Sequence, residues 1–284
     1  LTDRLSNEAV KFIRDQRDNR WALYLTHFAV HTPLQAKREL LAKYEAKPPG
    51  KLHDHAVMAT MIQAVDDGVG MIQETLDELG LTDNTVVIFF SDNGGFGPAT
   101  SMAPLKGYKG SYYEGGIREP FFVKWPGVVQ AGARCDVPII GVDLYPTLCD
   151  IAGASLPSEQ PVDGLSLLPL LRGDTASQFD RPLFWHFPAY LQAYSVVNGQ
   201  RDILFRSRPC SIIRRGDWKL LVFAWGKEPE LYNLAEDAAE KHNLADAKPE
   251  LVAQLMQELG TWKQSTRALP PDANPSFEGS FKKW

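Results

Sequence analysis

The sequence predicts an α/β protein in two parts: a mainly parallel sheet flanked by helices, then a small C-terminal subdomain with an antiparallel sheet and a helix. Strand-like apolar runs alternate with helical patterns in the first part, which is typical of parallel α/β layers. The pattern changes near Gly173, beyond which short strand candidates follow one another and one helical pattern closes the series. We therefore divide the chain into residues 1–175 and 176–284.

Four helices are expected in the first part, because apolar residues there recur on one helix face. Ser6 is expected to cap the first helix, and Gly80 and Gly153 are expected to end the third and fourth, since glycine readily adopts the conformation that terminates helices. The first carries Ala9, Val10, Phe12 and Ile13 on one face, and the others cover about residues 35–46, 53–79 and 144–152.

Three apolar runs are expected to form strands of the parallel sheet: residues 21–26, 85–90 and 120–125. The first, WALYLT, is almost continuously apolar, as in a strand that is buried on both faces. The second is rich in β-branched and aromatic residues, which favour strands.

The C-terminal part is expected to form a small antiparallel sheet with one helix. Gly216-Asp217 separates two strand candidates as a hairpin turn would. The expected strands are residues 183–187, 194–197, 211–214 and 218–223, the expected helix covers about 249–263, and the tail 269–284 is expected to be irregular.

The composition of the 284 residues is that of a globular protein, with 44% hydrophobic and 23% charged residues. A net charge of −5 gives no electrostatic reason to bind nucleic acid or acidic membranes. No apolar run is long enough to span a bilayer. The three cysteines, Cys135, Cys149 and Cys210, form no C-x-x-C pair, so neither a disulfide framework nor a zinc ribbon is expected.

The segment SDNGG follows an expected strand, so Asp92 and Asn93 lie at the carboxyl end, where open α/β sheets bind ligands. Gly94 and Gly95 permit the turn that brings both side chains to one ion. A carboxylate and an amide oxygen suit Ca²⁺ or Mg²⁺, but calcium takes about six to eight oxygen ligands, so other segments must contribute. The alternative is an Asx-rich turn that merely ends the strand.

A glycine-rich segment, residues 105–120, carries two lysines and an arginine, and such loops can bring a cation close to an oxyanion. Lys109 is the candidate for this role, and the alternative is a solvated surface lysine. Glu114 and Arg118 stand four residues apart and are expected to pair and shape the loop.

Histidines give a third set of candidates, each with a structural alternative. His31 follows the expected strand 21–26 and could donate to a bound oxyanion or act as a general acid. His27 lies nearer the strand, as a packed core histidine would, and His186 admits both interpretations.

Together these segments resemble the sulfatase family of the alkaline-phosphatase-like superfamily, from residue 3 to about residue 262. Residues 24–34 resemble the family segment that ends in a sulfate-contacting histidine, and residues 83–95 resemble its metal-binding strand end. Residues 109–120, KGSYYEGGIREP, resemble its second signature, whose lysine contacts the sulfate. Further similar segments are residues 66–81, 143–148, 163–170, 213–220 and 230–234.

The resemblance implies a type I sulfatase that hydrolyses a sulfate ester to an alcohol and inorganic sulfate. It assigns Asp92 and Asn93 to a Ca²⁺ or Mg²⁺ ion and Lys109 and His31 to catalysis. It also assigns Lys109 and His31 to substrate binding, and His186 is added to the substrate-binding candidates from its own sequence position. The implied partner is a sulfated small molecule or glycan, and the family expectation for location is periplasmic or secreted. The oligomeric state stays open.

The family nucleophile is formylglycine, made from the first residue of C/S-x-P-x-R, and the sequence contains no such motif. Cys135-Asp-Val-Pro138 and Cys210-Ser-Ile have the wrong spacing. The paired aspartates that complete the family's metal site also lack a counterpart, because Asp66-Asp67 lies within a helical pattern. We therefore expect the chain to begin after the first third of the enzyme, to carry an incomplete sheet and to be inactive alone.

Two alternatives differ from a sulfatase. A phosphatase or phosphonate hydrolase of the same superfamily would share the strand-end metal ligands, although residues 109–120 argue against it. A relative without a nucleophile would instead bind sulfated glycans or serve a structural role.

Overall fold

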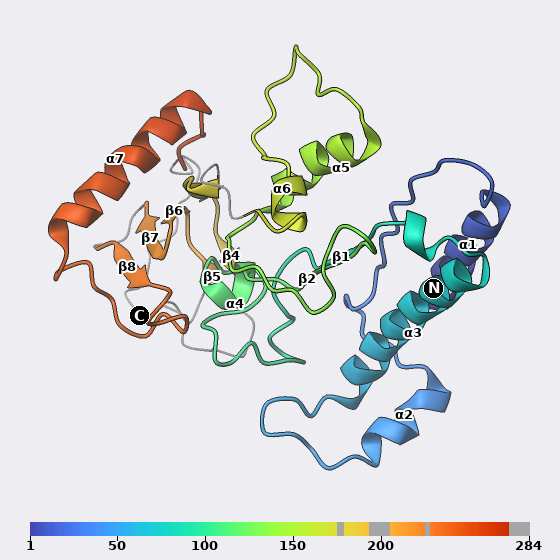
Figure 1. Ribbon diagram of the computed structural model, residues 1–284. Helices are drawn as coiled ribbons and strands as arrows, with labels where there is room; N and C mark the ends of the chain where they lie inside the picture. Colours follow the sequence, from blue (N-terminus) through green and yellow to red (C-terminus); the bar gives the residue numbers. More distant parts are fainter. Residues whose placement is uncertain (175–178, 193–204, 225–227, 273–284) are drawn as a thin grey trace.

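The computed structural model describes residues 1–174, 179–192, 205–224 and 228–272. Its helices are α1 (Thr2–Asp15), α2 (Arg38–Glu45), α3 (Ala56–Glu78), η1 (Thr82–Asn84), α4 (Glu114–Ile117), η2 (Gly141–Asp143), α5 (Leu144–Ala152), α6 (Leu168–Leu171) and α7 (Pro249–Ser265). Its strands are β1 (Val87–Phe90), β2 (Phe121–Lys124), β3 (Leu183–Phe187), β4 (Leu191–Gln192), β5 (Phe205–Ser207), β6 (Cys210–Arg215), β7 (Trp218–Phe223) and β8 (Glu230–Asn233). Figure 1 shows α1–α3 at one end, α7 with its sheet at the other, and β1, β2 and α4 between them. Within the described residues, no helix has the length and apolarity needed to cross a membrane.

The first helix begins before the expected cap, so the capping role predicted for Ser6 is wrong. Ser6 lies inside α1, is 1% exposed, and its hydroxyl donates to the carbonyl oxygen of Thr2 at 3.1 Å. A hydroxyl inside a helix satisfies itself in this way. It also faces α3, because a Cβ added to Gly68 would lie 2.3 Å from the Ser6 Oγ. The pattern therefore located the helix but not its first residue.

Glycine ends the two helices for which this was predicted. Gly80 follows α3 and Gly153 caps α5, each with φ of 67°. Both adopt the left-handed conformation that side chains other than glycine rarely take.

The predicted parallel pairing is not found: every pair of strands in the described residues is antiparallel. Strand β1 pairs with β2, with Val87 opposite Lys124 and Phe90 opposite Phe121. Residues 21–26 form no strand, and Tyr24 within them is 92% exposed. A strand needs a hydrogen-bonded neighbour, and no described segment supplies one to this run.

The C-terminal sheet has the order β3-β6-β7-β8. Gly216, with φ of 56°, lies in the predicted hairpin turn between β6 and β7. Helix α7 covers one face, where Ile213, Leu220 and Leu231 are 0% exposed. The predicted antiparallel sheet with one helix is therefore confirmed, whereas the expected strand at residues 194–197 lies outside the described residues.

Candidate functional site

The site begins where β1 ends. The amide of Ser91 donates to the Pro120 carbonyl at 3.2 Å, which continues the β1–β2 ladder by one step. The chain then turns, and the Asn93 Nδ2 donates to the Asp92 Oδ2 at 2.5 Å. Asp92 is exposed and Asn93 is half-buried. Two side chains with oxygen donors therefore lie next to each other just after the C-terminal end of β1.

The Lys109 segment packs directly against this turn. The Gly94 amide donates to the Gly116 carbonyl at 3.2 Å, and the Lys109 amide donates to the Gly95 carbonyl at 3.0 Å. A Cβ on Gly94 would lie only 2.3 Å from the Gly115 oxygen and 2.8 Å from the Lys109 nitrogen. Glycine is therefore required here for close backbone approach, and it sets Lys109 beside Asp92 and Asn93.

The backbone on both sides of Lys109 is held in a fixed shape. Gly107 and Gly110 have φ of 80° and 90°, in the region that favours glycine. The Tyr108 side chain is 1% exposed, and its amide donates to the Ser111 hydroxyl at 3.2 Å. Lys109 itself is half-buried, so a rigid loop presents a lysine that still reaches solvent.

Glu119 also lies at this site, although the sequence reasoning did not select it. Burial raises the pKa of Glu119 to about 7, a hydrogen bond with Ser91 opposes the shift, and the charge of Asp92 adds to it. Its Oε1 is buried without a hydrogen-bond partner among the described residues. The only available signal was an acidic residue within the glycine-rich segment, whose burial depends on the fold.

The predicted donor set fits part of a cation site. Asp92 and Asn93 offer hard oxygen atoms, which Ca²⁺ and Mg²⁺ prefer, and the unpartnered oxygen of Glu119 lies in the same region. The described residues contain no cluster of three or more His, Cys, Asp or Glu side chains that could hold a metal. Asp92, Asn93 and Glu119 are fewer than the roughly six to eight oxygen ligands that a Ca²⁺ ion takes.

The histidines lie apart from this group. His31 is exposed, and its Nδ1 lies 2.9 Å from the Thr32 carbonyl oxygen. In the described part of the chain, no hydrogen bond or ion pair joins His31 to Lys109, Asp92 or Asn93. Backbone hydrogen bonds therefore join the Lys109 segment to the turn that follows Asp92 and Asn93, and within the described residues none of them reaches His31.

His186 has a partner on each ring nitrogen. It lies on β3, with Nδ1 2.8 Å from the Ser211 hydroxyl and Nε2 2.7 Å from the Leu269 carbonyl oxygen. It lines a largely apolar cavity of about 220 Å³ between the sheet and α7, with Cys210 and Leu259 among the other lining residues. Contact with a substrate would require His186 to release one of its two partners.

Fold and site together define a class: an α/β protein whose polar site lies where a strand meets a glycine-rich lysine loop. A family model described as Sulfatase matches residues 1–154, and one described as N-sulphoglucosamine sulphohydrolase, C-terminal, matches residues 108–265. The chain belongs to the sulfatase family. The resemblance predicted from the motifs is thereby confirmed.

The chain is similar to known proteins in both sequence and structure. A protein of Formosa agariphila named Sulfatase is 35% identical, over 92% of this chain and 50% of that protein. The crystal structure of Ps i-CgsB in complex with k-i-k-neocarrahexaose superposes with a TM-score of 0.78 at 33% identity, over 96% of this chain and 57% of that one. The chain thus spans about half the length of these relatives.

A hydrolase of another type shares the fold less closely. The phosphonate monoester hydrolase SpPMH from Silicibacter pomeroyi superposes with a TM-score of 0.56 at 24% identity, over 74% of this chain. This likeness concerns the fold alone, and by TM-score, identity and coverage the chain is more similar to Ps i-CgsB than to SpPMH.

Proposed function

We propose that the protein hydrolyses sulfate esters to an alcohol and inorganic sulfate, and that this chain supplies part of the metal and sulfate site. Asp92 and Asn93 are the proposed metal ligands, and Lys109 and His31 the proposed sulfate contacts. The observation that supports the proposal is the 3.0 Å hydrogen bond from the Lys109 amide to the Gly95 carbonyl, which joins the backbone of Lys109 to the turn after Asp92 and Asn93. Membership of the sulfatase family supports the same chemistry.

A divalent cation on Asp92 and Asn93, Ca²⁺ or alternatively Mg²⁺, would supply positive charge against the sulfate oxygens. Glu119 could strengthen its binding through the oxygen that now has no hydrogen-bond partner. The remaining ligands would come from outside these segments.

Lys109 and His31 have separate proposed roles in the reaction. The Lys109 ammonium stabilises the negative charge that accumulates on the sulfate oxygens as the S–O bond breaks. His31 is exposed and can hydrogen-bond the sulfate or protonate the leaving alcohol oxygen. His186, with both nitrogens occupied, is the weakest of the proposed substrate contacts.

The nucleophile is proposed to be formylglycine, as the family resemblance implies. The 284 residues contain no C/S-x-P-x-R motif from which it could be made. We therefore propose that these residues alone do not turn over a sulfate ester, so activity must be tested on the product of the complete gene.

The proposed substrate is a sulfated small molecule or glycan. Ps i-CgsB, whose complex holds a hexaose, supports a glycan. The second candidate substrate is a phosphate or phosphonate ester, because SpPMH, which shares the fold, is named a phosphonate monoester hydrolase. Comparing 4-nitrophenyl sulfate with the matching phosphate and phenylphosphonate esters separates them: the proposal expects the highest kcat/KM with the sulfate, and preference for a phosphorus ester would contradict it.

Lys109→Ala tests the site assignment in the same protein. Loss of one preorganised electrostatic contact typically lowers turnover by about 10²- to 10³-fold, and we expect a loss of that size with 4-nitrophenyl sulfate. Lys124→Ala, which removes an exposed lysine of β2, is the matched control and should leave turnover unchanged. A Lys109→Ala loss below about threefold would reject Lys109 as a sulfate contact.

A further inference from the structure

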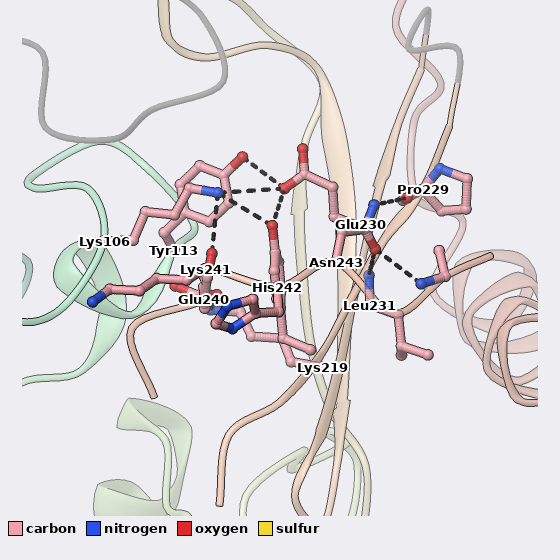
Figure 2. Close-up of polar contacts among 12 residues, drawn as sticks. Lys106, Tyr113, Lys219, Pro229, Glu230, Leu231, Glu240, Lys241, His242 and Asn243 are labelled. Carbon is pink, nitrogen blue, oxygen red and sulfur yellow. Dashed lines mark hydrogen bonds and ion pairs between the residues drawn. The ribbon is translucent and has the colours of Figure 1, made fainter. Parts of the chain in front are cut away.

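A cluster of charged side chains joins the loop that carries Lys109, residues 106–114, to the C-terminal sheet. Figure 2 shows Lys106 from this loop beside Glu230 and Glu240 of the C-terminal part. We call it the buried charge cluster and define it by five residues: Lys106, Glu114, Lys219, Glu230 and Glu240. Glu114, Lys219 and Glu240 are each at most 1% exposed. Lys106 and Glu114 lie on either side of Lys109 in the sequence, whereas the other three belong to or follow the C-terminal sheet.

The downstream end of the loop is held through Glu114. The Lys219 ammonium on β7 lies 2.9 Å from the Glu114 Oε1 and 2.9 Å from the Glu240 Oε1. The Glu240 Oε2 also accepts a hydrogen bond from the Glu114 amide at 2.6 Å. The predicted pair with Arg118 is present at 4.0 Å, but the contact with Lys219 is shorter. Glu114 is therefore fixed by both its side chain and its backbone.

The upstream end is held through Lys106. Its ammonium donates to the Tyr232 hydroxyl at 3.2 Å and to the Glu240 carbonyl at 3.4 Å, and it lies 3.9 Å from the Glu230 Oε2. It also lies 4.0 Å from the centre of the Tyr113 ring. A backbone hydrogen bond of 2.8 Å from the Gly115 amide to the Lys106 carbonyl joins the two ends of the loop.

The sheet also has an apolar core that is separate from this cluster. Apolar clusters lie on both faces of the sheet, and burying ions is often no more stabilising than burying apolar side chains of similar volume. Burial raises the pKa of Glu240, although the Lys219 ammonium opposes the shift. Glu240 also has φ of 52°, which is uncommon outside glycine. The buried charges and the positive φ of Glu240 both cost free energy, which is expected where residues hold a loop in one position.

We infer that Glu114, held by Lys219 and Glu240, is a positioning residue that fixes the Lys109 ammonium relative to Asp92 and Asn93. The inference rests on the proposed function. Both ends of the loop are attached to the C-terminal sheet. Between them, the Lys109 amide is hydrogen-bonded to the turn that follows Asp92 and Asn93. Weakening one attachment lets the lysine move, and a displacement of about 1 Å in a catalytic group can cost about 10²-fold in rate.

A double-mutant cycle tests this in the product of the complete gene, with 4-nitrophenyl sulfate as substrate. Glu114→Gln should lower kcat by about 10- to 100-fold, because it removes the charge that Lys219 holds. In the Lys109→Ala background, the same substitution should change kcat by less than about threefold, because Glu114 acts through Lys109. A substitution that only loosened the fold would lower kcat in both backgrounds alike.

Asp143→Asn is the matched control, because Asp143 is buried and ion-paired with Arg181 in another part of the molecule. It should lower the melting temperature and leave kcat unchanged below the melting range. If Glu114→Gln prevents folding, Glu240→Gln is taken through the same cycle, since it keeps an acceptor for the Glu114 amide.

The outcomes separate the inference from the proposed function. A folded Glu114→Gln protein with unchanged kcat, or with the same loss in both backgrounds, overturns the inference and leaves the proposed function standing. An unchanged kcat in Lys109→Ala overturns both. A loss with Glu114→Gln that disappears in the Lys109→Ala background supports the inference.

Discussion

The two main sheets contain similar apolar strands but differ in what covers them. In the C-terminal sheet, Ile212, Ile213 and Leu220 are 0% exposed, because α7 covers one face and the Lys109 loop reaches the other. In the β1–β2 pair, Phe90 is 43% and Phe122 is 65% exposed. Strand propensity therefore makes a strand in both places, but only packed neighbours bury it.

The largest effect of this difference is expected in the core of the C-terminal sheet. Leu220→Ala removes a side chain that is 0% exposed and packs against α7, and such truncations cost about 2–5 kcal/mol of unfolding free energy. Urea unfolding monitored by tryptophan fluorescence measures the cost. Leu148→Ala on α5 is the control, since Leu148 is 50% exposed and should lose much less. Equal losses in the two variants would contradict the comparison.

The sequence predicted local features of the fold better than distant ones. The ends of α3 and α5 and the β6–β7 hairpin were predictable, because single glycines determine them. Parallel pairing was not, because it depends on which strands meet rather than on their own composition. The run at residues 21–26 shows this, since an apolar segment without a hydrogen-bonded neighbour forms no strand.

The candidate site also combines local features, which the sequence indicates, with contacts between distant residues, which it does not. The contact between the turn after Asp92 and Asn93 and the segment of Lys109 joins two short motifs whose glycines permit close backbone approach, so these motifs could be selected from the sequence. The roles of the three residues stay predictions. The links from Glu114 to Lys219 and to Glu240 join residues 105 and 126 positions apart. Charged residues are ordinarily exposed, so nothing in their local sequence predicted that these three would be buried.

A smaller effect is expected when a cysteine buried in the C-terminal sheet is compared with an exposed cysteine in the segment that follows β2. Cys135 is exposed, whereas burial in the C-terminal sheet raises the pKa of the Cys210 thiol to about 11, with a hydrogen bond from Ser207 opposing the shift. At pH 8, iodoacetamide should therefore label Cys135 and leave Cys210 unlabelled until urea is added. Peptide mass mapping measures this, and rapid labelling of Cys210 in the folded protein would contradict its burial.

The same pKa difference predicts how stability depends on alkaline pH. Between pH 9 and about 11, the unfolded thiol loses its proton before the folded one does. The unfolded state then binds fewer protons, so the free energy of unfolding falls as pH rises, by at most about 1.4 kcal/mol per pH unit. Cys210→Ala should remove this component when unfolding is compared at pH 8.5 and pH 10.5. An unchanged slope in the variant would assign the pH dependence to other groups.

The smallest effect on stability is expected where the comparison began, on the exposed side of the β1–β2 pair. Phe122→Thr keeps strand propensity and removes an aromatic ring that is 65% exposed, so the free energy of unfolding should change by less than about 0.5 kcal/mol. An exposed apolar surface favours self-association, which the substitution should reduce in sedimentation experiments at increasing protein concentration. A loss above about 2 kcal/mol would instead mean that Phe122 is covered in solution, and the two sheets would then differ less than their exposures indicate.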